Sequence, residues 1–164
     1  MLSLPHVIIG SAAGLATGGP VGAFLGGIVS HHLMDMVPHY DVGTFYWKKK
    51  MPENWARRDI IIATVDFVLA MFALWWLWSQ AVGFGNLSSL IFWGGLGGVF
   101  PDIWHHTPFW KKYTRKMSVS AGWYRFHNTF HATIPPKYAW FGIFTQLVFV
   151  LFGLFIISLF VPLL

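Results

Sequence analysis

Residues 58–80 read RDIIIATVDFVLAMFALWWLWSQ, an apolar run that carries one carboxylate, Asp66, within its interior. About 20 predominantly apolar residues are enough for a helix to cross the hydrocarbon core of a bilayer. Further apolar stretches occupy about 4–17, 21–37, 87–106 and 138–164. The sequence therefore predicts an all-α protein, a polytopic membrane bundle of about five helices.

The composition supports a membrane protein and restricts its chemistry. The 164 residues are 55% hydrophobic and only 10% charged, which is too apolar for an ordinary soluble domain. There is no cysteine, which excludes disulfides, thiolate nucleophiles and cysteine-ligated metals. We expect one integral-membrane helical domain over residues 1–164, with a motif-bearing core at about 1–135 and a C-terminal anchor helix at about 138–164.

The basic residues predict an orientation, because they are confined to two connections. They are Lys48, Lys49, Lys50, Arg57 and Arg58 in one, and Lys111, Lys112, Arg115, Lys116, Arg125 and Lys137 in the other. The connections 18–20 and 81–86 carry no charge. By the positive-inside rule, the N-terminus and both basic loops are cytoplasmic in a bacterial-type inner membrane, and the C-terminus is outside. We attribute the net charge of +5 to orientation and to membrane lipids rather than to a nucleic acid.

The most specific motif is SHHLMDMVPHYD at residues 30–41. His31 and Asp35 are four residues apart, so a helix presents them on one face, where both can bind one ion. Pro38 is expected to end this helix and to let His39 curl back toward the pair. The alternative is a solvated helix end with a capping histidine. The adjacent His32 points elsewhere, toward a headgroup or the surroundings of the ion.

Two further motifs repeat this spacing. In FPDIWHH at residues 100–106, Asp102 is three or four residues from His105 and His106. Pro101 either kinks the helix or starts a new turn. In HNTFH at residues 127–131, His127 and His131 are four apart in the loop before the last helix. A helix-terminal cap and a headgroup contact are the respective structural alternatives.

Two single residues add to these motifs. Asp66 would be costly to ionise in lipid, so it is expected to face a partner inside the bundle, either a cation or a hydrogen-bond donor of another helix. His6 lies at the start of the first apolar stretch and is a lone histidine. The predicted topology puts both near the cytoplasmic side, together with all three motifs.

The glycines have a separate explanation. Gly10, Gly14 and Gly18, Gly22 and Gly26, and Gly94 and Gly98 recur every four residues. This small-residue pattern is typical of closely packed membrane helices. A phosphate-binding loop is not needed to explain it.

The candidate ligands gather on one side of the membrane. They are His6, His31, Asp35, His39, Asp102, His105, His106, His127 and His131. Imidazole and carboxylate ligands without cysteine predict one to three divalent ions, zinc first, with manganese or iron as alternatives.

The stretches Leu4-Pro5-His6, Ser30-His31 with Asp35 and Pro38-His39, and Pro101-Asp102 with His105 resemble the bacterial inner-membrane metal-dependent hydrolases of the YdjM-like group. That group is similar to the zinc-dependent phospholipase C and nuclease superfamily. The resemblance implies an all-α fold with His and Asp metal ligands at these positions and, less closely, at His127 and His131.

The predicted function is a metal-dependent hydrolase that acts on a phosphoester or a lipid-type substrate through a metal-activated water. Asp41 or Asp66 would serve as a base, and Arg125 would stabilise a phosphate. The alternatives are a membrane di-iron oxygenase or desaturase, and a non-enzymatic metal- or haem-binding or transport protein. The sequence leaves the oligomeric state open.

Overall fold

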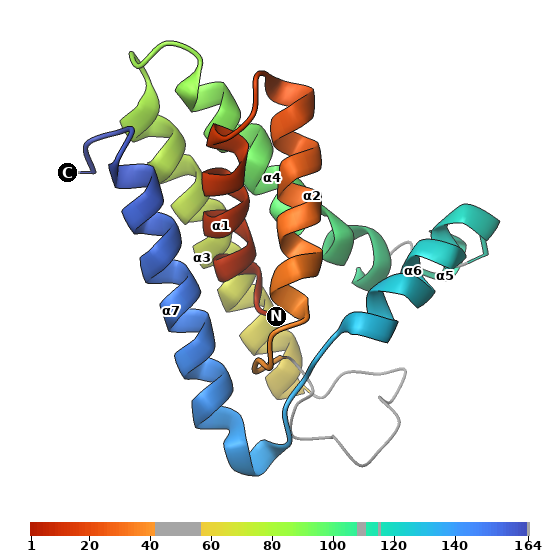
Figure 1. Cartoon of the computed structure of the whole chain (residues 1–164). Helices are drawn as coiled ribbons and strands as arrows, with labels where there is room; N and C mark the ends of the chain where they lie inside the picture. Colours follow the sequence, from red (N-terminus) through yellow and green to blue (C-terminus); the bar gives the residue numbers. More distant parts are fainter. Residues whose placement is uncertain (42–56, 108–110, 115, 164) are drawn as a thin grey trace.

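The regular structure of the chain is helical. The computed structural model describes residues 1–41, 57–107, 111–114 and 116–163, and the elements in these ranges are helices apart from one isolated β-bridge between His39 and Thr133 (Figure 1). The helices are α1 (Ser3–Leu15), α2 (Pro20–Asp35), α3 (Arg57–Ala81), α4 (Leu87–His106), α5 (Lys111–Thr114), α6 (Ser118–Phe130) and α7 (Ala139–Ser158), with a 3-10 turn, η2, at Pro136–Tyr138. The predicted loop residues Lys48, Lys49, Lys50 and Arg115 lie outside the described ranges.

The five predicted helices correspond to α1, α2, α3, α4 and α7, but the expected total of five is wrong because α5 and α6 add two more in the described ranges. His127 and His131 were expected in a loop, whereas His127 lies in α6 and His131 directly follows it. α6 is amphipathic rather than uniformly apolar, so a search for apolar spans misses it. α2 ends at Asp35, before Pro38, and α4 continues through Pro101 without ending.

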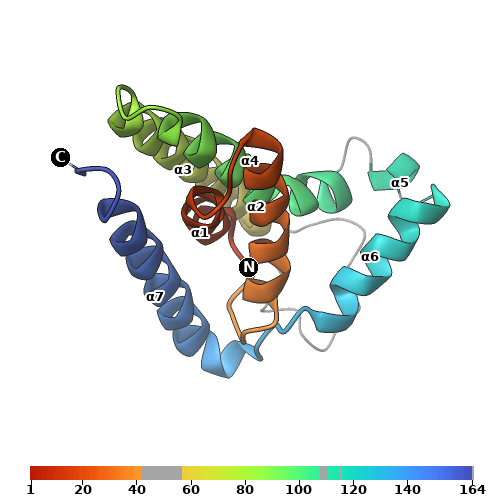
Figure 2. The same cartoon turned by 45° about the horizontal axis from the view of Figure 1, so that its top comes forward.

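α1 is the central helix of the bundle. It packs against α2, α3, α4 and α7, and α2 packs against α4 (Figures 1 and 2). α6 projects away from these helices on the side opposite α7 (Figure 2). α1 begins and α2 and α4 end at the same end of the bundle. This is the end that the sequence predicts to be cytoplasmic.

Glycines allow α1, α2 and α4 to approach closely. A Cβ added to Gly10 would meet backbone atoms of Gly94 and Gly98, and one added to Gly27 would meet the backbone of Gly94, Gly97 and Gly98. The predicted role of the 10/14 and 94/98 glycine pairs in helix packing is confirmed. Gly18 has no neighbouring atom at this distance, so its place in the repeat has no such role.

Two of the described helices, α3 and α7, are long and apolar enough to cross a membrane, and α1 is apolar but shorter. A membrane bundle of about five helices was expected, so this expectation is met in part. Large apolar side chains on both long helices face outward, among them Phe72 and Trp75 on α3 and Phe144 and Leu151 on α7.

Backbone hydrogen bonds hold the end of α6 against the end of α2. The Ala132 N–H donates to the Asp35 carbonyl at 2.8 Å, and the His39 N–H donates to the Ala132 carbonyl at 3.1 Å. The Ile134 N–H donates to the His39 carbonyl at 3.2 Å. These contacts join segments about 95 residues apart in the chain and place His131 beside Asp35.

Candidate metal centre

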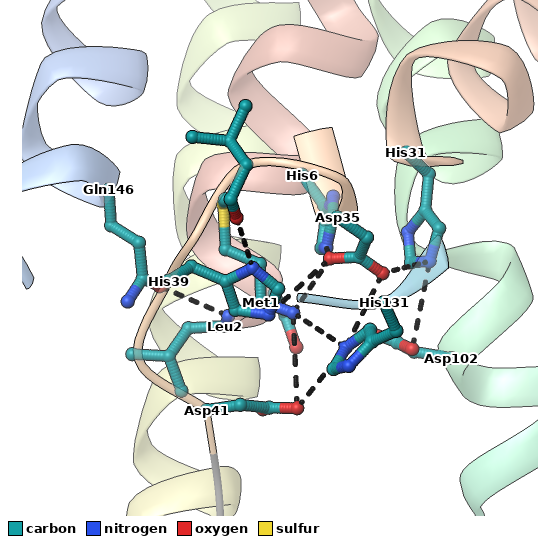
Figure 3. Close-up of polar contacts among 12 residues, drawn as sticks. Met1, Leu2, His6, His31, Asp35, His39, Asp41, Asp102, His131 and Gln146 are labelled. Atoms are coloured by element: carbon teal, nitrogen blue, oxygen red, sulfur yellow. Dashed lines mark hydrogen bonds and ion pairs between the residues drawn. The ribbon is translucent and has the colours of Figure 1, made fainter. Parts of the chain in front are cut away.

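The Asp35 carboxylate is the centre of a histidine cluster (Figure 3). It ends α2 and is 1% exposed. Its Oδ2 atom lies 2.9 Å from His127 Nε2, 3.2 Å from His31 Nε2 and 3.6 Å from His131 Nε2. The predicted shared face of His31 and Asp35 thus gives a direct contact, and the other two histidines come from α6 and the residue that follows it.

The second oxygen of Asp35 has its own neighbours. Oδ1 lies 3.2 Å from His6 Nε2 on α1 and 3.8 Å from His39 Nε2 in the segment after α2. The amino group of Met1, a cation, is 2.8 Å from the same oxygen. One buried carboxylate therefore has five imidazole rings and a positive charge around it.

Asp102 extends the cluster toward α4. Its Oδ1 lies 3.7 Å from His31 Nε2, and Asp102, His6 and His31 each offer a ligand atom within 4.8 Å of the others. Three further groups of this kind are Asp102, His106 and His127; Asp35, His39 and His131; and His31, His32 and His127. These buried clusters of His and Asp side chains could bind a metal ion.

The members of the cluster differ in how exposed they are. Asp35, His6, His31, His39 and His127 are almost completely buried. The side chains of Asp102, Asp41 and His131 are 25%, 22% and 19% exposed, and Asp41 Oδ2 lies 3.5 Å from His131 Nε2. These three residues are partly exposed, and we call them the rim of the cluster.

Backbone carbonyls fix which ring nitrogens carry hydrogen. His31 Nδ1 lies 2.8 Å from the Gly98 carbonyl and His39 Nδ1 lies 2.8 Å from the Val37 carbonyl. A carbonyl only accepts, so Nδ1 donates in both rings, and the neutral ring presents the Nε2 lone pair to the cluster. Both Nε2 atoms are buried and make no hydrogen bond. The Met1 amino group supplies a cation beside Asp35 Oδ1. The His31 lone pair faces the other oxygen, Oδ2, and there requires a cation between the two atoms or a proton on the ring.

His6 adds a second reason to expect a cation in the cluster. Its ring stacks on His31 with centroids 3.9 Å apart, and neither of its buried nitrogens makes a hydrogen bond. Two stacked imidazolium rings would repel each other, so both rings cannot be protonated together without a large penalty. A divalent ion satisfies the lone pairs without this repulsion.

The histidines that follow α2 and α6 are held in the neutral form that binds metals. Burial, followed by the positive charge of the N-terminal amino group, lowers the pKa of His39 to about 2. The same two causes, in the same order, lower the pKa of His131 to about 3. Both imidazoles are therefore neutral at physiological pH, as metal ligation requires.

Two further histidines beside the cluster, His32 and His105, contact Trp123. The indole N–H of Trp123 donates to His32 Nε2 at 2.9 Å, so the neutral His32 ring carries its hydrogen on Nδ1 and has no free lone pair. His105 is buried with its ring centroid 4.7 Å from that of Trp123 and 5.6 Å from that of Tyr124. In the described ranges, His106 but not His105 belongs to a group of converging ligand atoms.

Asp66 and Arg125, which were suggested as catalytic, have other surroundings than the histidine cluster. Asp66 accepts the backbone N–H groups of Ser3 at 2.6 Å and Leu4 at 3.2 Å and so caps the start of α1. Of the two partners expected for Asp66, the structure gives the hydrogen-bond donors. Arg125 is exposed, and two helical residues put it about 160° around α6 from His127.

Sequence reasoning missed Gln146 of α7, which was expected to be only an anchor. The Gln146 Oε1 accepts the Leu2 N–H at 3.1 Å, and its Nε2 donates to the Tyr40 carbonyl at 2.9 Å. The neighbouring Thr145 hydroxyl donates to the Pro38 carbonyl at 3.0 Å. Both residues fix the segment that carries His39, and a Thr-Gln pair within an apolar helix was the available signal.

Comparisons with known proteins gave no match to a family model, a curated protein or a solved structure. The resemblance to the YdjM-like hydrolases is therefore without support from these comparisons. The structure itself gives a coarser result, which is a helical protein with buried His and Asp clusters suited to a metal.

Proposed function

We propose that the chain is a membrane-embedded, metal-dependent hydrolase whose centre is built around Asp35. The ligands would come from His6, His31, Asp35, His39, Asp102, His106, His127 and His131, which can be shared among one to three ions. Zinc is the first expectation, because the set contains imidazole and carboxylate but no thiolate.

The observation that carries the proposal is the tautomer of two buried histidines. His31 and His39 each donate from Nδ1 to a carbonyl and direct Nε2 at Asp35 without a hydrogen bond. Ligating histidines commonly have such an outer hydrogen bond, because it fixes the ring and strengthens the ligand. A buried protein interior rarely leaves lone pairs facing a carboxylate, so a bound cation is the simplest completion.

The open rim favours catalysis over a purely structural ion. Catalytic metal sites keep a position for water or substrate, whereas structural sites are closed. Asp41, Asp102 and His131 are partly exposed beside otherwise buried ligands. An ion at this centre would supply a Lewis acid and a water of lowered pKa.

We assign Asp41 as the proton acceptor of the proposed reaction. Water would add to phosphorus, its proton would pass to Asp41, and the bond from phosphorus to the leaving alcohol would break. Asp41 would then return the proton to the alcohol. Asp41 fits this role because it lies on the rim, and Asp66 is not included because it caps α1.

Membrane location is part of the proposal. It is supported by the length and apolar character of α3 and α7 and by the large apolar side chains that both expose. The starts of these two helices lie at the same end of the bundle (Figure 1). This arrangement agrees with two crossings that enter from the side predicted to be cytoplasmic.

Elemental analysis of the detergent-purified protein tests the centre. After a mild chelator wash, the wild type should retain at least one equivalent of zinc or manganese. Asp35→Asn, which preserves the side-chain shape, should weaken metal affinity by at least about tenfold. The matched control is Asp59→Asn, since Asp59 is also a buried carboxylate but its ion-pair partner is Arg58.

The same samples test the reaction. Metal-loaded wild type should hydrolyse a phosphodiester, and Asp41→Asn should lower kcat by about 10²-fold or more while the metal content stays unchanged. Absence of metal from the wild type would overturn the proposed centre. Iron with an iron-dependent optical spectrum would replace the hydrolase with the oxygenase alternative, and bound zinc without hydrolysis of any phosphoester would favour a non-enzymatic role.

A further inference from the structure

One face of α6 is buried against the rest of the protein, and another face is apolar and exposed. Ser120 and His127 are buried: Ser120 accepts the Trp104 indole N–H at 3.0 Å, and His127 Nε2 lies 2.9 Å from Asp35 Oδ2. Val119, Phe126 and Phe130 are 85%, 52% and 45% exposed. Spacings of seven and eleven residues put these three within about 20° of one direction around the helix, so they form one exposed apolar stripe.

The surroundings of the stripe are basic. Lys112 and Lys116 precede α6, Arg125 lies on it, and all three are exposed. The sequence from Ile103 to Leu164 contains six basic residues and no aspartate or glutamate. A surface that combines an apolar helix face with uncompensated positive charge is complementary to an anionic lipid interface.

We propose that α6 lies in the interface of a membrane that contains anionic phospholipid, with the stripe formed by Val119, Phe126 and Phe130 against the acyl chains. Lys112, Lys116 and Arg125 then contact the lipid phosphates. An acidic protein surface would match the charge but not the exposed aromatic rings, and a second copy of this basic segment would repel the first.

The proposal deepens the proposed function, since it names the substrate class. Val119 is about 80° around α6 from His127, which faces the centre. The ring of Phe126 is also 5.5 Å from that of His32, next to the ligand His31. A phospholipid seated along the stripe thus has its headgroup beside the centre, so the hydrolysed bond belongs to an anionic phospholipid.

Single-cysteine variants test the docking, since the chain has no cysteine of its own and each variant can be labelled at one position. The test depends on neither metal nor activity. The two variants are Val119→Cys and Asn128→Cys. Both residues are exposed on α6 but lie on opposite sides of it. Each is labelled with the fluorophore NBD and placed in nanodiscs of phosphatidylcholine with phosphatidylglycerol. Dithionite then bleaches the label wherever water reaches it.

The label at position 119 should bleach at least about tenfold more slowly than the label at 128, and nitroxide-bearing acyl chains should quench only the former. Pure phosphatidylcholine, or a Lys112→Gln, Lys116→Gln background, should speed the bleaching at 119. Equal rates at both positions, protection that does not depend on anionic lipid, or cross-linking of two copies through position 119 would each overturn the proposal.

A second measurement separates this proposal from the proposed function. If the metal-loaded protein hydrolyses a soluble phosphodiester but not phosphatidylglycerol in the same nanodiscs, the hydrolase stands and the lipid substrate fails. If the label at 119 is protected and no phosphoester is hydrolysed, α6 docks on lipid and the hydrolase fails.

Discussion

The carbonyl oxygens of Gly98 and Val37 decide which nitrogen of His31 and His39 faces Asp35. Each accepts an Nδ1–H at 2.8 Å, so each ring is fixed in tautomer and in direction before any ligand binds. The Gly98 carbonyl belongs to α4 at the point where α4 meets α1. Helix packing and ligand orientation therefore depend on the same residue.

At the residue scale, Gln146→Leu should weaken the centre from a distance. The change removes the side chain that donates to the Tyr40 carbonyl and accepts from Leu2, and it leaves the buried carbonyl without that donor. We expect a loss of about 1–3 kcal/mol in stability and about 10- to 100-fold weaker metal binding. Thermal unfolding and metal titration measure both effects.

Ser158→Ala is the control in the same helix, because the Ser158 hydroxyl donates only to the Phe155 carbonyl within α7. It should change neither quantity by a comparable amount. Unchanged metal affinity in Gln146→Leu would show that the position of His39 does not depend on α7.

Local spacing predicts the contacts that lie within one helical turn. The separation of His31 and Asp35 was sufficient to predict their contact, which is 3.2 Å between Nε2 and Oδ2. The partners of Asp66 could not be predicted in this way, since they are the backbone N–H groups of Ser3 and Leu4, more than 60 residues away. Backbone donors carry no sequence signal, so only the fold reveals them.

At the scale of the elements, α1, α2 and α4 form one closely packed unit because glycines face backbone atoms across both contacts. Gly27 faces the backbone of Gly94, Gly97 and Gly98, where no side chain can move aside. His31 is one turn further along α2 and donates to the Gly98 carbonyl. Separation of α2 from α4 would therefore also move a ligand.

We expect Gly27→Ala to destabilise the protein by about 1–3 kcal/mol or more and to reduce its metal content, because the added methyl group overlaps the α4 backbone. Gly122→Ala is the control, since Gly122 lies in α6 with no neighbouring atom within 4 Å of an added Cβ. It should be neutral or stabilising by up to about 1 kcal/mol. Far-UV circular dichroism during heating compares the two; similar melting temperatures would contradict the packing argument.

The helix that sequence analysis missed is the one that completes the cluster. α6 mixes Val119, Phe126 and Phe130 with polar residues, so its apolar content is too low for a span. Its helical period was nevertheless present in the sequence, with Ser120 and His127 on one side and the stripe on another. A search for amphipathic periodicity would have found it, although the β-bridge from Thr133 to His39 depends on contacts between distant segments.

At the scale of the whole molecule, the chain runs back and forth between the two ends of the helical bundle. The connection from α1 to α2 and the connection from α3 to α4 lie at one end, and the candidate centre lies toward the other (Figure 1). These two connections carry no charge, whereas Arg57 and Arg58 begin α3 and Lys137 precedes α7 at the end that holds the candidate centre. The positive-inside rule applied to this arrangement predicts that the rim of the centre lies on the cytoplasmic side.

Phe84→Cys and Asn128→Cys test this orientation, because Phe84 is exposed in the connection from α3 to α4 and Asn128 is exposed on α6. In intact spheroplasts, a membrane-impermeant maleimide should label position 84 and spare position 128. After permeabilisation it should label both, which shows that position 128 is reactive once it can be reached. Labelling of 128 but not 84 in intact spheroplasts would place the centre outside the cell, and its substrate would then have to be sought in the outer leaflet.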